Sequence, residues 1–265
     1  MLKIQYSMGL GTKTVKILLT NDDGIEAPGL DAMVRILGQD HKITVAAPNR
    51  EQSALSQGFS FHVDYGVEET GDRRFRVGGT PVDCVMFALS QFDGFDVVIS
   101  GINRGANIAW DTWYSGTIGA ACEAARRGVK AIAVSLNTVG HLAEHHYDEA
   151  ARTLRRYIER SLLDVIPLGQ VLNVNFPNIV ELMNSSPQWA RPGHYAYSLN
   201  QLLTRPENPG RWRVQVMQLE TYRDPDCETD GQLIRSGPTF SLLRIAWPEP
   251  DETDAHAVKK WLSQL

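Results

Sequence analysis

The chain has 265 residues, of which 26 are lysine or arginine and 31 are aspartate or glutamate, giving a net charge of −5. This balance argues against a protein whose main task is to bind nucleic acid, because such proteins normally present a net basic surface. With 43% hydrophobic and 22% charged residues, the composition is that of a folded globule rather than a disordered chain. We expect one large domain, or one domain with an appendage.

Short branched runs alternate with amphipathic segments from residue 15 to residue 177. The predicted strands, in chain order, are 15–20, 43–47, 95–100, 131–136 and 171–176. Four helices are predicted. The first begins at Pro28 and is ended by Gly38, the second begins after the N-cap Thr80, and the other two cover 117–127 and about 147–162. Strands that alternate with helices predict βαβ units. We therefore predict an α/β fold, Rossmann-like and doubly wound, with a mostly parallel sheet as the body of the protein.

The pattern changes after Pro177, where prolines interrupt the chain and the alternation is lost. Strand candidates remain at 213–219 and 240–245. The tail from residue 253 carries an apolar helical face made of Val258, Trp261, Leu262 and Leu265. We expect residues 178–265 to form a C-terminal arm or small antiparallel extension with a terminal helix.

The cysteines and the N-terminus bear on the compartment. The three cysteines are an odd number without C-x-x-C spacing, so neither a disulfide framework nor a zinc site is expected. No apolar run approaches the roughly 18 residues of a membrane span. Residues 1–14 lack the pattern of a secretory signal and are taken as an N-terminal extension. We expect a cytoplasmic protein without a membrane partner.

Oxygen-rich loops follow the first three predicted strands. They carry Asn21, Asp22 and Asp23 after the first strand, Asn49, Glu51, Gln52, Ser53 and Ser56 after the second, and Asn103, Asn107, Asp111, Ser115 and Thr117 after the third. Ligands of open parallel sheets bind at the carboxyl ends of the strands. Carboxylate, amide and hydroxyl oxygens are the ligands of a hard cation such as Mg²⁺ or Mn²⁺. The convergence of three such loops indicates a divalent-cation site.

Each fragment also has a simpler interpretation. Asp-Asp-Gly after a strand is more often a turn, and the serines and asparagines can be ordinary polar loop residues. The segment 100–119 is more specific, because its glycines allow backbone N–H groups to approach an anion at the start of a helix. The G-x-G-x-x-G and P-loop motifs are absent, which argues against a dinucleotide or P-loop site.

Six segments, in order, resemble the stationary-phase survival protein E (SurE) family. They are Ile17–Leu30, 47–56, 79–84, Ser100–Asn107, Tyr114–Gly119 and Leu172–Pro177. The resemblance implies a metal-dependent 5′-nucleotidase acting on nucleoside monophosphates, with 3′-nucleotidase and exopolyphosphatase activities as further options. It also implies a homodimer or homotetramer assembled through the C-terminal arm, and no stable nucleic-acid partner.

The resemblance also implies roles for individual residues. One divalent metal ion per subunit, Mg²⁺ or Mn²⁺, would be held by Asp22, Asp23, Ser53 and Asn103. The phosphate would be bound by Asn107, Ser115, Gly116 and Thr117. We expect Asp22 to be the catalytic nucleophile or general base and Asp23 mainly a metal ligand, although the two roles can be exchanged.

The chain departs from the family pattern in three places. Ala54 stands where glycine is common, and Ala109–Trp110–Asp111 stands where Gly-Asp-Asp is usual. The family's C-terminal Thr-Asp and Tyr-Val-Ser-x-Thr-Pro-Leu pattern is only echoed by Thr229–Asp230 and residues 240–243. Substrate preference is therefore the least defined property.

Some features keep alternatives open. Trp110, Trp113 and Tyr114 can stack a base, wall the pocket, or pack in the core or an interface. His141 and His145 are spaced i, i+4, but without the H-E-x-x-H order a solvated loop or helix start is favoured over a zinc site. A non-enzymatic nucleotide- or metal-binding regulator is the main alternative function. An aspartyl-phosphate enzyme is less well supported, because its loop usually has the order D-x-D.

Overall fold

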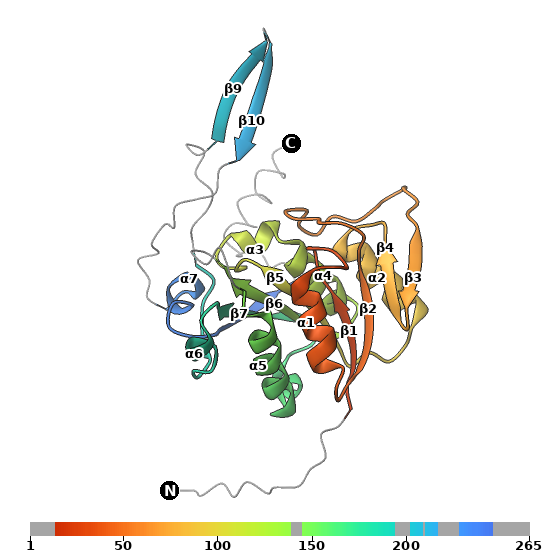
Figure 1. Cartoon of the computed structure of the whole chain (residues 1–265), viewed down its shortest axis with the longest axis vertical. Helices are drawn as coiled ribbons and strands as arrows, with labels where there is room; N and C mark the ends of the chain where they lie inside the picture. Colours follow the sequence, from red (N-terminus) through yellow and green to blue (C-terminus); the bar gives the residue numbers. More distant parts are fainter. Residues whose placement is uncertain (1–13, 139–144, 194–201, 209, 217–227, 246–265) are drawn as a thin grey trace, which may run out of the picture.

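The computed structural model describes residues 14–138, 145–193, 202–208, 210–216 and 228–245. Its strands are β1 (Lys16–Thr20), β2 (Lys42–Pro48), β3 (Val67–Gly71), β4 (Arg74–Val77), β5 (Val97–Arg104), β6 (Lys130–Asn137), β7 (Gln170–Pro177), β8 (Gln188–Trp189), β9 (Leu202–Asn208), β10 (Arg211–Val216) and β11 (Thr239–Arg244) (Figure 1). Its helices are α1 (Pro28–Leu37), α2 (Pro81–Gln91), α3 (Asp111–Tyr114), α4 (Gly116–Arg126), α5 (Tyr147–Glu159), the 3₁₀ helix η1 (Leu162–Val165), α6 (Val180–Met183) and α7 (Asp230–Leu233).

The main sheet has nine strands in the order β3-β4-β2-β1-β5-β6-β7-β11-β8. β1 pairs in parallel with β2 on one side and with β5 on the other, and β6 and β7 continue the parallel arrangement beyond β5. The chain moves outward from β1 and then returns to add β5 at its other edge, which places the topological switch point between β1 and β5. The doubly wound α/β fold predicted from the sequence is confirmed.

Helices cover both faces of the sheet. Ile17 and Leu19 of β1 belong to a core cluster shared with α1 and α5, whereas Leu18 faces the opposite cluster with α2 and α4. Burial on both faces explains why the central strands are continuous apolar runs. Each fully buried Leu or Ile contributes roughly 1.5–3 kcal/mol relative to an exposed one, so these runs hold the sheet centre rigidly.

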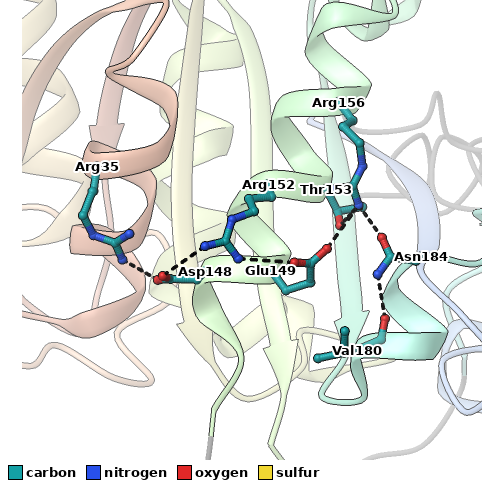
Figure 2. A network of polar contacts seen from close by, with 8 residues as sticks. All are labelled: Arg35, Asp148, Glu149, Arg152, Thr153, Arg156, Val180 and Asn184. Carbon is teal, nitrogen blue, oxygen red and sulfur yellow. Dashed lines mark hydrogen bonds and ion pairs between the residues drawn. The ribbon is translucent and has the colours of Figure 1, made fainter.

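A polar network joins the outer surfaces of α1, α5 and α6 (Figure 2). Its members are, in order, Arg35, Asp148, Arg152, Glu149, Arg156 and Asn184. The ion pairs are partly exposed to solvent, with N–O separations of 3.7 Å between Arg152 and Asp148 and 3.4 Å between Arg156 and Glu149. Pairs of this kind contribute about 0–1 kcal/mol each. The network therefore orients α5 relative to its neighbours more than it stabilises the fold.

Several elements differ from their predicted bounds. The strand predicted to end at Ser100 continues as β5 to Arg104. The helix predicted to reach Leu162 ends at Glu159, because Ser161 adopts a left-handed conformation with φ of 64° before η1. The sequence does not predict β3, and every residue of that strand is exposed, so the usual apolar alternation is missing.

The region after Pro177 contributes to two different parts of the structure. β11 pairs antiparallel with β7 and so extends the main sheet, which means that this segment is not part of a separate arm. β9 and β10 form a two-stranded hairpin that lies away from the main sheet (Figure 1). The predicted terminal helix over 253–265 lies outside the described residues. Among the residues that are described, no helix is long and apolar enough to cross a membrane.

Candidate active site

The turn after β1 is formed by Asn21 and Gly24. The Asn21 side-chain amide donates to the Gly24 carbonyl at 2.8 Å, and the Gly24 N–H donates back to Asn21 Oδ1 at 3.2 Å. Gly24 has a φ of 104°, a conformation that favours glycine. The turn expected of the Asp-Asp-Gly motif is therefore present, but its hydrogen bonds join Asn21 and Gly24. The side chains of Asp22 and Asp23, which lie between these residues, do not form the turn.

Asp22 lies against the N-terminus of α4. Its carboxylate is 4% exposed and accepts a hydrogen bond from the Thr117 hydroxyl. A Cβ atom added to Gly116 would lie 2.9 Å from Asp22 Cβ and 3.0 Å from Oδ2, so glycine is required for this close approach. The first turn of a helix stabilises a neighbouring negative charge. The sequence thus joins β1 and α4 at one carboxylate.

Asp23 points toward the end of β5, where its Oδ2 accepts the Arg104 N–H at 3.1 Å. β5 changes register against β6 between Ser100 and Asn103, and a Cβ on Gly101 would lie 2.1 Å from the Val134 carbonyl oxygen. The close packing at Gly101 therefore sets the path of the strand end that meets Asp23. Asn103, predicted to lie in a loop, is on this strand, and its side-chain amide donates to the Gly105 carbonyl at 2.8 Å.

The loop after β2 reaches the same place. The Gln52 N–H donates to the Asp22 carbonyl at 2.7 Å, which anchors the loop to the turn after β1. Ser53 is exposed, and its hydroxyl donates to Glu51 at 2.8 Å. Ser53 Oγ still has lone pairs that can accept a cation. The structure therefore links the loops that carry the four predicted metal ligands.

The electrostatics of the two aspartates fit a cation. Burial raises the pKa of Asp22, and the hydrogen bond from Thr117 opposes that shift. Burial also raises the pKa of Asp23 to about 6, and the neighbouring charge of Asp22 adds to the shift. Raised pKa values in two adjacent carboxylates show that the protein groups around them supply too little positive charge to compensate for burial. A divalent cation supplies that charge, so the residues present fit such an ion.

The donor set for the cation is mixed. Within the described ranges, no group of three or more His, Cys, Asp or Glu side chains is arranged to hold a metal. The carboxylates of Asp22 and Asp23 must therefore be completed by other oxygens, and Ser53 and Asn103 offer a hydroxyl and an amide oxygen. Oxygen donors of this kind suit Mg²⁺ or Mn²⁺ rather than a soft metal.

The residues predicted to bind phosphate gather at the start of α4. Ser115 caps the helix by accepting the Ile118 N–H at 3.1 Å, and Thr117 is fully buried with its hydroxyl on Asp22. Hydrogen bonds from Gly116 and Thr117 backbone groups also lower the pKa of Asp22, against the larger effect of burial. The donors of this helix end therefore face Asp22 in the described structure.

Asn107 is fixed in a buried polar layer. Its side-chain amide donates to Ser135 at 2.7 Å and its N–H donates to the Asn175 side chain at 2.8 Å. The Asn107 carbonyl accepts from Asn173 and Asn175 at 2.9 and 3.1 Å. Ser135, Asn173 and Asn175 were missed by reasoning from the sequence. The available signal was the alternation of asparagine with buried apolar residues along β7.

Two further groups lie beside the site. Trp110, Trp113 and Tyr114 are 46%, 66% and 50% exposed, which excludes the core among their predicted locations. Tyr147, at the start of α5, was also missed. Burial raises its pKa to about 12 and the charge of Asp23 adds to that shift, so the phenol lies within the electrostatic reach of Asp23. Of the histidine pair, His141 lies outside the described part of the chain.

The fold and the site define a doubly wound α/β protein with paired aspartates and a helix N-terminus at its topological switch point. The family model described as "Survival protein SurE" matches residues 17–198. The chain belongs to the SurE family, as the six sequence segments indicated.

Similar proteins span different parts of the chain. A 5′-nucleotidase SurE of Vibrio campbellii is 41% identical over 170 residues, which are 63% of this chain and 64% of that protein. The matched part thus spans a little less than two thirds of that relative's length. A 5′-nucleotidase SurE of Magnetococcus marinus is 34% identical over 250 residues, 92% of this chain and 98% of that protein. The crystal structure of the SurE protein from Aquifex aeolicus is similar with a TM-score of 0.76 and 25% identity, covering 94% of this chain and 99% of that one.

Proposed function

We propose that this chain is a divalent-metal-dependent phosphomonoesterase that hydrolyses nucleoside monophosphates to nucleoside and phosphate, that is, a 5′-nucleotidase. The observation that carries the proposal is the position of two adjacent carboxylates at the switch point, Asp22 against the N-terminus of α4 and Asp23 at the end of β5. The relatives named 5′-nucleotidase support the same activity here. Hydrolysis of 3′-nucleotides and of polyphosphate belongs to the same proposal.

We place one Mg²⁺ or Mn²⁺ ion per subunit at Asp22, Asp23, Ser53 and Asn103. Bound there, a divalent ion would supply the positive charge that stabilises phosphate oxygens during displacement. The adjacent carboxylates of Asp22 and Asp23, one buried and one at the end of β5, support this placement. Ser53 and Asn103 would complete the set without adding negative charge.

The protein's own groups would act on the phosphate and on the attacking water. Asp22 is the proposed general base or nucleophile, because its buried carboxylate lies against the proposed phosphate site at the start of α4. As base, it takes a proton from water while the water oxygen bonds to phosphorus and the bond to the nucleoside oxygen breaks. The departing oxygen then takes that proton from Asp22, directly or through a water molecule, to become a hydroxyl, which returns Asp22 to its ionised form. Thr117 fixes the carboxylate through its hydroxyl.

The start of α4 is the proposed phosphate site, with Ser115, Gly116, Thr117 and, from the preceding loop, Asn107. Backbone N–H groups at a helix N-terminus bind anions and stabilise charge that develops on phosphate oxygens. The N–H groups of Gly116 and Thr117 donate to Asp22 in this structure, which supports the view that they can donate to either a carboxylate or a phosphate. Substrate phosphate would therefore compete with Asp22 for these donors and turn it toward the metal.

Assembly and compartment form the remaining part of the proposal. The hairpin of β9 and β10 lies away from the sheet and carries Trp212, which is 65% exposed (Figure 1). These features support an arm for a homodimer or homotetramer, which light scattering after size-exclusion chromatography tests. Cys84 and Cys122 are free and buried, which supports a reducing compartment such as the cytoplasm.

The decisive experiment measures phosphate release from nucleoside monophosphates with Mg²⁺ or Mn²⁺, with and without excess chelator. We expect metal-dependent hydrolysis that Asp22→Asn abolishes while the folded state is retained. Asp72→Asn, in the exposed turn between β3 and β4, is the matched control and should be fully active. Hydrolysis that persists in chelator would exclude the metal-dependent mechanism. Nucleotide binding without hydrolysis under any metal would instead favour the regulator.

A further inference from the structure

Asp230 is a buried carboxylate from the region after β7 that contacts the loop before α3. It is fully buried, and the Ala109 N–H donates to its two oxygens at 3.3 and 3.1 Å. Its Oδ1 also accepts the N–H groups of Gly193 at 3.0 Å and Gly231 at 2.8 Å. Hydrogen bonds from N–H groups to an ionised acceptor are among the stronger ones in proteins. One side chain therefore joins three backbone segments.

Ala109 is the member of this group closest to the site, and its conformation is unusual. It has a φ of 49° and is 1% exposed. Alanine rarely adopts this left-handed conformation, and such a residue persists only where the surrounding contacts enforce it. The carboxylate of Asp230 supplies such a contact directly at the Ala109 N–H.

Contacts continue from Ala109 to the metal and phosphate residues. The Ala109 carbonyl accepts the Thr112 hydroxyl at 2.7 Å, at the start of α3. At the end of α3 the carbonyls of Trp113 and Tyr114 accept from the Ser56 hydroxyl at 2.6 Å and the Ser56 N–H at 2.9 Å. Ser56 lies on the loop that carries Ser53. α4, whose first turn holds Asp22, begins directly after α3.

We propose that Asp230 is a positioning residue for the reaction: by fixing Ala109 it sets the place of α3 and of the start of α4, and hence of the phosphate donors. This inference deepens the proposed function and depends on it for its kinetic consequences. The part of the chain after residue 177 therefore acts on phosphate binding itself, in addition to its place in the sheet and in the hairpin.

Asp230→Asn tests this role. The asparagine oxygen can keep the place of Oδ1 toward Gly193 and Gly231, but its NH₂ group then replaces Oδ2. The Ala109 N–H thereby loses its 3.1 Å acceptor, faces a second donor there, and keeps only the 3.3 Å contact to the retained oxygen. We expect kcat/KM to fall roughly tenfold, because small misplacements of catalytic groups have effects of this order. The loss should be equal for a nucleoside monophosphate and for p-nitrophenyl phosphate, since both present the same phosphate.

Glu123→Gln is the matched control, because Glu123 is a buried carboxylate near the other end of α4 that pairs with Arg126 and Arg127. Assayed well below the Tm of each variant, it should keep wild-type kcat/KM. Wild-type kcat/KM in Asp230→Asn for both substrates would overturn the proposal. A loss confined to the nucleotide would also overturn it, because that result places the effect of Asp230 on the nucleoside side.

Amide hydrogen exchange gives a readout that does not depend on activity or on the folding of a variant. In the wild-type protein the Ala109 amide should exchange at least tenfold more slowly than an exposed loop amide, although it lies outside any helix or strand. In Asp230→Asn the Ala109 amide should exchange faster than in the wild-type protein, and in Glu123→Gln its exchange should not change. A wild-type Ala109 amide that exchanges freely would overturn the proposal. If no substrate is hydrolysed at all, the proposed function fails and the exchange result still decides the role of Asp230.

Discussion

Gly116→Ala is the most direct test of how Asp22 is held. The added Cβ would lie 2.9 Å from Asp22 Cβ and 3.0 Å from its Oδ2, well inside ordinary van der Waals contact. Either the carboxylate or the first turn of α4 must therefore move by roughly half an ångström or more. Overpacking of this kind destabilises by about 1–3 kcal/mol. Replacing a helical glycine by alanine offsets up to about 1 kcal/mol of that loss.

Activity should suffer more than stability, because the atoms that must move belong to the proposed base and to the phosphate donors. We expect kcat/KM to fall by roughly 10- to 100-fold, as misplacement of reacting groups does elsewhere. Steady-state phosphate release with Mn²⁺ gives the activity, and thermal unfolding gives the Tm.

Gly66→Ala is the matched control, since a Cβ at Gly66 meets no atom within 4 Å. It should change neither activity nor Tm appreciably. A Gly116→Ala enzyme with activity within twofold of wild type would refute the close approach of Asp22 to α4 as a requirement for the reaction.

Four other changes test the same region. Gly119→Ala should unfold at a clearly lower Tm than Gly116→Ala, because its Cβ would lie 2.2 Å from the Ser56 backbone carbonyl, which has less freedom to move. Thr117→Val should lower kcat, whereas Thr117→Ser should retain it, because only serine keeps the hydroxyl that donates to Asp22. Equal kcat values in the two variants would contradict the role of that hydrogen bond. Without metal, stability should fall by about 2 kcal/mol through Asp23 as pH rises from 4 to 7, because Asp23 keeps its proton in the folded state up to a pKa of about 6 and in the unfolded state only to about 3.8. Burial also raises the pKa of Asp22, so denaturation curves of Asp23→Asn should show a shallower slope and those of the Asp22→Asn/Asp23→Asn double variant should lack it. A divalent cation at 100 times its Kd should stabilise the wild-type protein by about 2.7 kcal/mol and raise its Tm. A cation-dependent Tm shift of the same size in an Asp22→Asn/Asp23→Asn double variant would contradict the proposed metal site.

The sequence predicted those parts of the structure whose signals are local. The branched run before Asn21, the Thr80–Pro81 helix start and the glycine-rich approach to α4 each depend on neighbouring residues, and all three are present. Because the carboxyl ends of parallel strands share one edge, the meeting of the turn after β1 with the end of β5, where the Arg104 N–H donates to Asp23, also followed from the predicted topology.

The remaining features depend on contacts between distant residues. Asp230 meets Ala109 across 121 positions, and Asn175 meets Asn107 across 68. A buried acceptor of this kind has no local pattern, since its partner is a backbone N–H that every residue except proline offers. The pairing of β11 with β7 was missed for the same reason, because the sequence of an isolated strand candidate does not indicate which strand it pairs with.

The position of β11 also has a consequence for synthesis of the protein. Nearly all of β7 is buried, and until residues 239–244 are available it presents one row of unpaired backbone groups at the edge of the sheet. An apolar edge of this kind is a template for pairing with another chain. Asp230 leaves the ribosome just before β11. The contact of Asp230 with Ala109 and the pairing of β11 with the edge of β7 therefore form at the same stage of synthesis. A nascent or truncated chain that stops near residue 177 therefore lacks the contact between Asp230 and Ala109 and also exposes an unpaired strand edge that is prone to aggregation.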